Sequence, residues 1–505
     1  MVAFRRAALP ALLSVAILAA FGLETPVLAT NRPAVNRAYQ HLLRFEAARE
    51  ARMAARGHAG AASGQTGSSV ASRTPAAPVN VQQISEDTLK GGQQGTQVEP
   101  DLAMDPNNDA NLVAVSQQGR FKTGGSVDPG FATSHDGGAT WTSGNLPGLT
   151  KAVGGSFDRG SDVTAIFGPN HDAYTSAITF SFGHRDCPSA VAVNRSGDAG
   201  LTWDDPDFPE NDTSCDIFND KNWLGADTNP ASPYFGRLYL VWSLFTPTGS
   251  PAVLRYSDDQ GATWSDLIFV SGPDAESEGL LPLVHSNGDL TIVYDDVVGG
   301  QDLEVAQTST DGGLSFGPTV TVGEFLGAGD PGLRTGGLPA AAIDPTTDDM
   351  YVVWQDTRFG SDGHNDIVLS TSTDGGASWS SPARVNGPDP AGQVLDHFTP
   401  DVAAYGGSVH VTYATRDFAG KKASEFVDER YIASVDGGAT FGGELILGPP
   451  TDLKYAAQVT SSIEFLGDYQ AVVADQNGAH AAWCVALYAK NSRYNETVWS
   501  GTIAP

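Results

Sequence analysis

An eight-residue pattern, Ser-x-Asp-x-Gly-x-Thr/Ser-Trp/Phe, occurs six times between residues 134 and 441. Its aspartates are Asp136, Asp198, Asp259, Asp311, Asp374 and Asp436, which follow one another at intervals of 52 to 63 residues. A repeat of so regular a period indicates that one structural unit is used several times along the chain. This regularity constrains the fold more than any other feature of the sequence.

The residue types of this octet suit a tight turn between two strands. The Asp side chain can accept hydrogen bonds from backbone N–H groups inside the turn, and the Gly permits a positive φ there. The terminal aromatic residue is a large apolar group that can pack between neighbouring sheets. We therefore interpret the six aspartates as structural residues, rather than as metal ligands or catalytic acids.

Strand-like segments precede the octets. Segments such as 238–242, 290–294 and 350–354 are rich in β-branched and aromatic residues and are bounded by turn residues. Each follows a shorter segment of smaller residues, which suits a crowded innermost strand. The unit is then four strands with the octet before the outermost one, and four-stranded sheets set radially around an axis form a β-propeller. The sequence thus predicts an all-β fold.

The starts of the innermost strands indicate the number of units. They are expected near Glu99, Asp162, Asp220, Glu278, Arg334, His397 and Asp468. These seven starts favour seven blades, and the six octets leave six blades as the alternative. The last unit, residues 467–503, has no octet and lacks an outer strand. Residues 79–84 are expected to supply that strand, so that both ends of the chain close the ring.

The first 29 residues have the pattern of a secretory signal peptide. A basic pair, Arg5 and Arg6, precedes an apolar run that ends in a small-residue cleavage pattern. A membrane anchor is the alternative, but the run is short and contains Pro10, and no second span follows. We therefore expect a secreted, extracellular protein whose mature chain has no membrane span.

Residues 30–78 differ in composition from the repeats. An Ala/Arg/Glu-rich stretch over 34–55 predicts one helix, and a Gly/Ser/Ala/Thr/Pro-rich stretch over 57–78 predicts a flexible linker. We expect both stretches to lie outside the core. The propeller domain is expected to span residues 79–505.

Charge and cysteine content narrow the range of partners. The chain has 59 acidic and 29 basic residues, a net charge of −30, which argues against binding to nucleic acid. In an oxidising compartment Cys187 and Cys215 are the expected disulfide pair, and Cys484 is expected to be a buried free thiol. No His/Cys grouping suggests zinc, and we expect no cofactor. The density of acidic residues leaves a structural calcium ion open, although no loop has a known calcium-ligand spacing.

The octet resembles the Asp-box, or BNR repeat, and residues 95–505 resemble the sialidase superfamily of propellers. The resemblance implies a site with a Tyr–Glu nucleophile pair, an Asp acid/base and three arginines around the substrate carboxylate. Glu278 is similar to the family's Glu, Tyr469 to its Tyr and Asp128 to its acid/base Asp. Arg358 is similar to the third arginine. The stretches 97–100 and 295–296 stand where the first and second arginines are expected, and neither contains one.

Strand register predicts a cluster of polar residues independently of this resemblance. The starts of the innermost strands and the ends of the second strands share one face of a propeller, opposite the octet turns. Residues expected on that face include Arg120, Arg159, Arg334, Arg358, Arg416, Asp220, Lys221, Asp468 and His397. Guanidinium groups suit a carboxylate or sulfate on a sugar, and interleaved carboxyl groups raise one another's pKa. His397, next to Asp396, is a candidate base.

These features lead to three functional hypotheses. The first is a secreted sialidase-like glycoside hydrolase that is exo-acting on acidic glycans, with Arg334 and Arg358 holding the anionic group. The second is a non-catalytic propeller that binds a glycan or a protein. The third is a polysaccharide lyase acting on a uronate, with His397 or Tyr469 as base. The expected partner is a carbohydrate, and the protein is expected to be a monomer.

Overall fold

The structure is a computed structural model that describes residues 36–56, 77–183, 186–360, 363–419 and 423–504. All of them belong to one compact unit of the chain. The predicted signal peptide and residues 57–76 of the predicted linker lie outside the described residues.

Most strands of the described part of the chain fall into seven consecutive antiparallel groups, which we call sheets 1 to 7. Sheets 1 and 2 are joined in one eight-stranded sheet, sheet 6 has a fifth strand, and β18, β28 and β29 form a further small sheet. Sheet 1 contains β2 (Gln97–Met104), β3 (Leu112–Arg120), β4 (Ser126–Ser134) and β5 (Thr142–Asn145). Sheet 2 contains β6 (Arg159–Phe167), β7 (Ala173–Phe180), β8 (Ser189–Ser196) and β9 (Asp207–Asp212). Sheet 3 contains β10 (Phe218–Ala226), β11 (Leu238–Phe245), β12 (Ala252–Ser257) and β13 (Ile268–Phe269). Sheet 4 contains β14 (Ser277–Val284), β15 (Leu290–Val298), β16 (Gln301–Ser309) and β17 (Val320–Glu324).

The remaining sheets follow the same order. Sheet 5 contains β19 (Ala340–Ile343), β20 (Met350–Asp356), β21 (Asp366–Ser372) and β22 (Ala383–Arg384). Sheet 6 contains β23 (Leu395–Tyr405), β24 (Ser408–Asp417), β25 (Phe426–Ser434) and β26 (Leu445–Ile446), with β27 (Thr451–Asp452) also paired to β25. Sheet 7 contains β30 (Ala471–Asp475), β31 (Gly478–Ala486), β32 (Glu496–Ile503) and β1 (Val79–Gln83). Short 3-10 helices span Lys151–Val153 and Leu453–Tyr455.

The first strands of consecutive sheets pack against one another. The contacts join β2 to β6, β6 to β10, β10 to β14, β14 to β19, β19 to β23 and β23 to β30, and β30 also contacts β2. In sheet 7, β1 pairs with β32, so the strand from the N-terminal side is the fourth strand of the last sheet, as the sequence predicts. One pair, Ser126 with Gly160, links β4 of sheet 1 to β6 of sheet 2.

The octets form the turns that follow the third strand of sheets 1 to 6. In sheet 3, Asp259 accepts hydrogen bonds from the backbone N–H of Thr263 at 2.8 Å and from its hydroxyl at 2.6 Å. Ser257 donates to Asp259 and accepts from the N–H of Gly261 at 2.9 Å. The Asp bonds recur in the other five copies. In the first copy, bonds from Thr140 and Ser134 lower the pKa of Asp136 to about 2. The aspartates of the octets therefore hold the turns.

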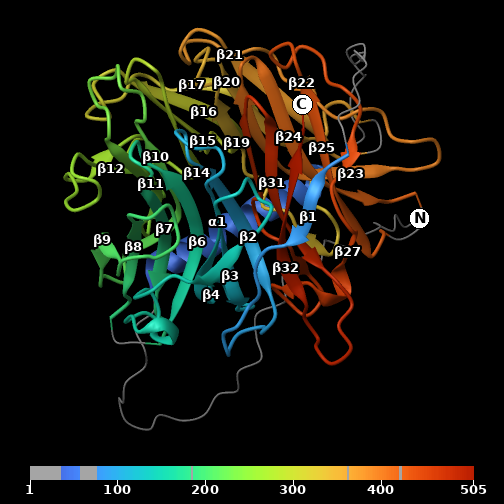
Figure 1. Ribbon diagram of the computed structural model, residues 1–505, viewed down its shortest axis with the longest axis horizontal. Coiled ribbons are helices and arrows are strands. Elements are labelled where there is room, and N and C mark those ends of the chain that lie inside the picture. Colours follow the sequence, from blue (N-terminus) through green and yellow to red (C-terminus); the bar gives the residue numbers. More distant parts are fainter. Residues whose placement is uncertain (1–35, 57–76, 184–185, 361–362, 420–422, 505) are drawn as a thin grey trace, which may run out of the picture. The chain divides into compact units, whose positions relative to one another are not determined.

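Helix α1 (Arg37–Arg56) differs from the prediction in its packing rather than in its existence. Its buried residues include Ala38, Leu42 and Phe45, which pack with side chains of sheets 2 and 3 in one hydrophobic cluster. Met53, near the other end, packs into a cluster of sheets 4 and 5. The expectation that this stretch lies outside the core was therefore wrong. Figure 1 shows α1 in the middle of the view, with sheets on either side.

Arg334 also lies elsewhere than expected. The first strand of sheet 5 begins at Ala340, not near Arg334. Arg334 belongs to β18 (Leu333–Arg334), which pairs in parallel with β29 (Glu464–Phe465), and β29 pairs with β28 (Ala457–Gln458). Within the described ranges, no helix combines the length and the apolar character needed to cross a bilayer.

Candidate functional site

Two neighbouring cavities adjoin the starts of the first strands. Their volumes are about 590 Å³ and about 430 Å³. Five of the described side chains line both, and they are Glu46, Lys221, Glu278, Arg334 and Asp468. Glu46 comes from α1, whereas the other four come from sheet 3, sheet 4, β18 and the segment before β30. These paired cavities are the candidate site.

Bulges at the starts of the first strands place the charged side chains. In β2, β6 and β10 the register shifts over two residues, and within each shift one non-glycine residue has a positive φ. These residues are Glu99 at 55°, Asp162 at 48° and Lys221 at 48°. A bulge re-aims side chains that would otherwise alternate between two faces. Consequently Asp220 and Lys221, although adjacent in sequence, both line the larger cavity.

Lys221 is surrounded by acidic groups at this site. Its Nζ lies 3.8 Å from a carboxylate oxygen of Glu99 and 3.9 Å from one of Asp468. The same nitrogen lies 4.4 Å from the centre of the Tyr469 ring. Burial alone would lower the pKa of Lys221, but the neighbouring carboxylates outweigh it and raise this pKa. The ammonium group therefore stays charged, and within the described residues it has no hydrogen-bond partner.

The carboxyl groups at the site titrate in opposite directions. Burial raises the pKa of Glu99 to about 7 and that of Glu278 to about 7, although Lys221 and Arg49 respectively act to lower them. Burial and Asp162 raise the pKa of Asp220 well above its usual value. In contrast, Arg334 and Lys221 overcome the burial of Asp468 and lower its pKa. Near neutral pH the site therefore holds protonated carboxyl groups beside one that stays ionised.

Two of the five predicted arginines reach the paired cavities. Arg334 donates to both carboxylate oxygens of Asp468, at 3.2 and 2.8 Å, and to Glu46 at 3.0 Å. Arg120 lies 4.6 Å from the centre of the Phe465 ring and lines the larger cavity. The contact between Arg334 and Glu46 of α1 shows that Arg334 binds a carboxylate from another element inside the cavity.

The other three predicted arginines contact other side chains and line neither cavity. Arg358 donates to Asp356 at 2.7 and 2.8 Å. Arg416 pairs with Asp330, and Arg159 donates to Thr123 at 2.9 Å and lies over aromatic rings. Three of the five arginines that were expected on one face therefore do not line the paired cavities.

Tyr469 lies beside the site but outside the paired cavities. Its ring packs edge-on against Trp223, with 5.4 Å between ring centres, and its hydroxyl donates to the carbonyl of Val163 at 3.4 Å. Burial raises the pKa of Tyr469 well above its usual value. Tyr469 instead lines a cavity of about 20 Å³ that it shares with Arg334. The phenol is therefore neutral and held beneath Lys221.

Asp128 and His397 do not line the paired cavities. Asp128 is fully buried in β4, where desolvation raises its pKa to about 8. The His397 ring lies between the carbonyl of Asn365 at 2.9 Å and the amide of Asn386 at 3.4 Å. Neither residue therefore lines the cavities to which Glu278 contributes.

The side chains that the sequence analysis missed belong to α1. Arg49 is buried and lies 3.5 Å from Glu278 and 3.0 Å from Asp295. Buried positions of α1 follow helical spacing at Ala38, Leu42, Phe45, Arg49 and Met53. This spacing was the available signal, since it marks one face of a helix. The spacing is hard to recognise in the sequence because Arg49, a charged residue, occupies one of the buried positions.

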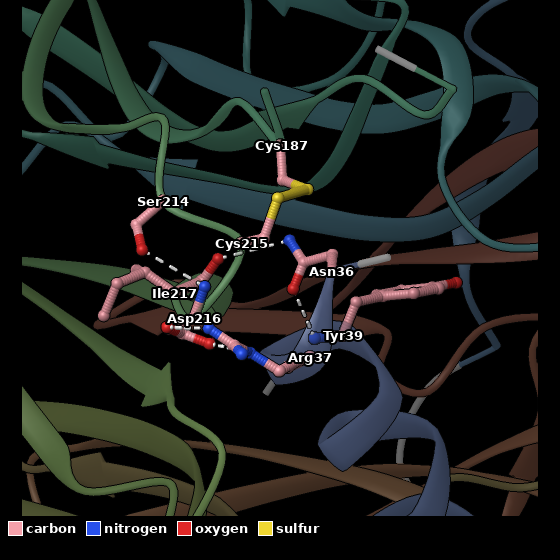
Figure 2. The surroundings of a disulfide bond; sticks show 8 residues. All are labelled: Asn36, Arg37, Tyr39, Cys187, Ser214, Cys215, Asp216 and Ile217. Carbon is pink, nitrogen blue, oxygen red and sulfur yellow. Dashed lines mark hydrogen bonds and ion pairs between the residues drawn. A yellow bond between two sulfur atoms is a disulfide. The ribbon is translucent and has the colours of Figure 1, made fainter. Parts of the chain in front are cut away.

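The disulfide lies beside the start of α1. Cys187 and Cys215 are bonded, which is the pairing expected from the sequence. The N–H of Arg37 donates to the carbonyl of Cys215 at 2.6 Å, and the Arg37 side chain pairs with Asp216 (Figure 2). Asn36 caps the helix by accepting from the N–H of Tyr39 at 2.8 Å. The bridged segment therefore holds α1 at its first turn.

The described residues contain no group of three metal-ligating side chains.

Comparisons with known proteins give weak similarities only. No protein-family model and no curated protein matches the sequence. A solved structure of a protein of unknown function from Dyadobacter fermentans is 13% identical, with 84% of this chain and 99% of that chain covered and a TM-score of 0.44. An α-L-arabinofuranosidase from Fusarium graminearum is 12% identical, with 70% and 98% covered and a TM-score of 0.46. An intramolecular trans-sialidase from Ruminococcus gnavus is 14% identical, with 67% and 93% covered and a TM-score of 0.44. The function must therefore be argued from the cavities themselves.

Proposed function

We propose that this protein is an exported glycoside hydrolase that acts on the end of an acidic glycan, with the paired cavities as its active site. The observation that carries the proposal is the pair of unlike carboxyl groups there. Glu278 has a pKa raised to about 7, whereas the pKa of Asp468 is lowered. Glycoside hydrolysis needs one carboxyl group as a proton donor and another that stays charged next to the developing cation.

We further propose that the seven sheets form a closed seven-bladed propeller. Two observations support it: the cyclic order of contacts among the first strands, in which β30 returns to β2, and the pairing of β1 with β32. In such a ring, the starts of the first strands face a common axis. The proposed site then occupies one mouth of the ring, and the octet turns lie on the opposite face.

In the proposed reaction, Glu278 gives its proton to the glycosidic oxygen as the bond to the anomeric carbon breaks. Asp468 stabilises the cationic sugar electrostatically. Water then adds to the anomeric carbon and gives its proton to the Glu278 carboxylate, which restores the acid. Arg334, with Arg120 nearby, binds the carboxylate of the sugar. The contact between Arg334 and Glu46 at 3.0 Å supports this last role, because it is a carboxylate contact inside the cavity.

Export is supported by the disulfide, since such bonds persist in oxidising compartments. Tyr469 as nucleophile and Asp128 as acid/base remain predictions from the family resemblance. Replacing Tyr469 with Phe tests the first of them: unchanged turnover removes Tyr469 from the mechanism.

The test is hydrolysis of aryl glycosides that carry either an acidic sugar, a sialoside or a glucuronide, or a neutral one, a galactoside. We expect turnover of an acidic glycoside that declines as pH rises through about 7, because Glu278 must be protonated to act. Glu278→Gln should lower kcat by about 10²- to 10⁴-fold, since Gln cannot donate an acidic proton. The control Glu324→Gln, at an exposed position, should retain activity. Absence of turnover both by the parent chain and by variants in which α1 is released contradicts the proposal. An unsaturated uronide product would indicate a lyase instead.

A further inference from the structure

We propose that α1 is a built-in inhibitor whose charged side chains imitate a ligand in the paired cavities. Glu46 takes the place of a substrate carboxylate on Arg334, and Arg49 covers Glu278. The nature of the imitated ligand rests on the proposed function. The position of the helix at the cavities is independent of the proposed function.

Helix α1 lies against both cavities. Residues of the helix, among them Tyr39, Leu42 and Glu46, line the larger cavity, and Arg49 and Met53 line the smaller one. A ligand entering either cavity would therefore meet the helix. Without α1, the walls formed by Lys221, Glu278, Arg334 and Asp468 would belong to one wider opening.

Arg334 binds two carboxylates at once. Asp468, close to it in the fold, is bound at two atoms, and Glu46 reaches the same guanidinium nitrogen from α1 at 3.0 Å. The pairing with Asp468 already neutralises Arg334. The second carboxylate therefore marks a position where Arg334 accepts a further anion, and a sugar carboxylate can replace Glu46 there.

Arg49 is buried against Glu278, the proposed proton donor. Only 4% of Arg49 is exposed, and its guanidinium lies 3.5 Å from Glu278 and 3.0 Å from Asp295. It also donates to the carbonyl of Gly337 at 2.6 Å. A cation so close to Glu278 favours the ionised carboxylate, the form that cannot donate a proton. Glu46, on the same helix, acts in the opposite direction on this pKa, so the helix opposes catalysis chiefly by covering Glu278.

Helix α1 is joined to the sheets by side-chain packing and by ion pairs at its two ends. It is anchored at its start by Cys215 and Asp216, and at its end Arg52 and Arg56 pair with Asp302. It contributes no strand to any sheet. The helix can therefore move away without breaking a β-ladder. The observed affinity for a ligand is then proportional to the fraction of molecules in which the helix has moved, and it is low while the helix stays in place.

A designed disulfide tests this inference on the full chain. A Cβ atom built on Gly329 lies 3.8 Å from the Cβ of Met53, which suits a disulfide bond. The double variant Met53→Cys/Gly329→Cys should lock α1 in place when oxidised and free it when reduced. In the oxidised form we expect turnover of the acidic aryl glycoside to be at least about tenfold slower. Binding of N-acetylneuraminate, measured by saturation-transfer NMR, should be at least about tenfold weaker. The single variant Met53→Cys, in both redox states, controls for the lost methionine and for reduction of the native disulfide.

A second variant acts in the opposite direction. Arg37→Ala/Arg52→Ala/Arg56→Ala removes ion pairs at both ends of α1, and none of the three residues lines the paired cavities. We expect faster amide hydrogen exchange in α1 together with several-fold stronger probe binding. Faster exchange without stronger binding overturns the inference, as does an oxidised double variant that binds the probe like its reduced form.

Probe binding and glycoside hydrolysis, measured on the same variants, separate this inference from the proposed function. If locking abolishes probe binding but no form hydrolyses a glycoside, the inhibitor is supported and the hydrolase is wrong. If the locked and free forms hydrolyse equally well, the hydrolase is supported and the inhibitor is wrong. If no form binds the carboxylate sugar, the imitation of such a ligand is overturned.

Discussion

At the scale of single residues, the site depends on backbone strain at the bulges. Glu99, Asp162 and Lys221 adopt positive φ values, which cost non-glycine residues on the order of 1–3 kcal/mol each. In sheet 4 the corresponding bulge has Gly279 at 69°, where no such cost arises. Strain retained at three charged positions, all lining one cavity, is typical of a functional site.

Asp101 gives a residue-scale prediction about pH. Burial raises its pKa from 3.8 to about 6, although it accepts a hydrogen bond from the N–H of Ala165 at 2.7 Å. Between these two pH values the folded chain binds more protons at Asp101 than the unfolded chain does. The contribution of Asp101 to stability therefore decreases as pH rises through this window.

We expect Asp101→Asn to match the parent protein in Tm near pH 4 and to exceed it at pH 8, because Asn can still accept the bond from Ala165 without a buried charge. Thermal unfolding at both pH values measures this. Asp274→Asn, at an exposed position, should leave the difference between the two pH values unchanged. A lower Tm for Asp101→Asn at pH 8 would contradict the prediction.

Residues whose partners are distant in sequence limited what could be predicted about the site. Lys221, Glu278 and Asp468 were expected on one face because strand starts share a face, and all three line the paired cavities. Arg416 was expected on the same face but lines neither cavity, and it pairs with Asp330 in a loop of another part of the chain. Strand register gives the face on which a side chain begins, but it does not give the carboxylate that neutralises it.

At the scale of elements, the octet turn was predicted in chemical detail because all of its partners are local. Ser257 is fully buried and bonds to Asp259 and Gly261, both within four residues. The helix α1 was predicted as a helix for the same local reason. Its packing depends on Phe180, Phe218 and Phe245 in distant strands, and composition does not reveal such contacts.

The octet turn can be tested at Ser257. Ser257→Ala removes a donor to Asp259 and leaves the N–H of Gly261 without its acceptor. We expect a loss of about 1–2 kcal/mol in the free energy of unfolding, which is usual for a buried hydrogen-bonding group deprived of its partner. Urea denaturation measures it. Ser381→Ala, at an exposed position, is the control, and an equal loss in both variants would argue against a special role for the octet.

At the scale of the whole domain, the sequence predicted the joining of the first and last sheets. Ile84 follows β1, and its N–H donates to the carbonyl of Val498 in β32 at 2.9 Å. Its side chain packs in a cluster with Leu102 and Leu112 of sheet 1 and Ala482 of sheet 7. Residues nearly 400 positions apart thus share one cluster, as expected where a propeller closes through its terminal strands.

The proposed closure of the ring makes Ile84 a test of the whole domain. Only 5% of Ile84 is exposed, so Ile84→Ala should remove about 2–4 kcal/mol from the free energy of unfolding. Val79→Ala, in the same segment but 55% exposed, should change it by less than about 0.5 kcal/mol. If the sheets form a closed ring, one joint supports them all, and denaturant unfolding of Ile84→Ala should remain a single transition at a lower midpoint. A separate early transition, with the remaining sheets unchanged, would show instead that sheets 1 and 7 open independently of the others.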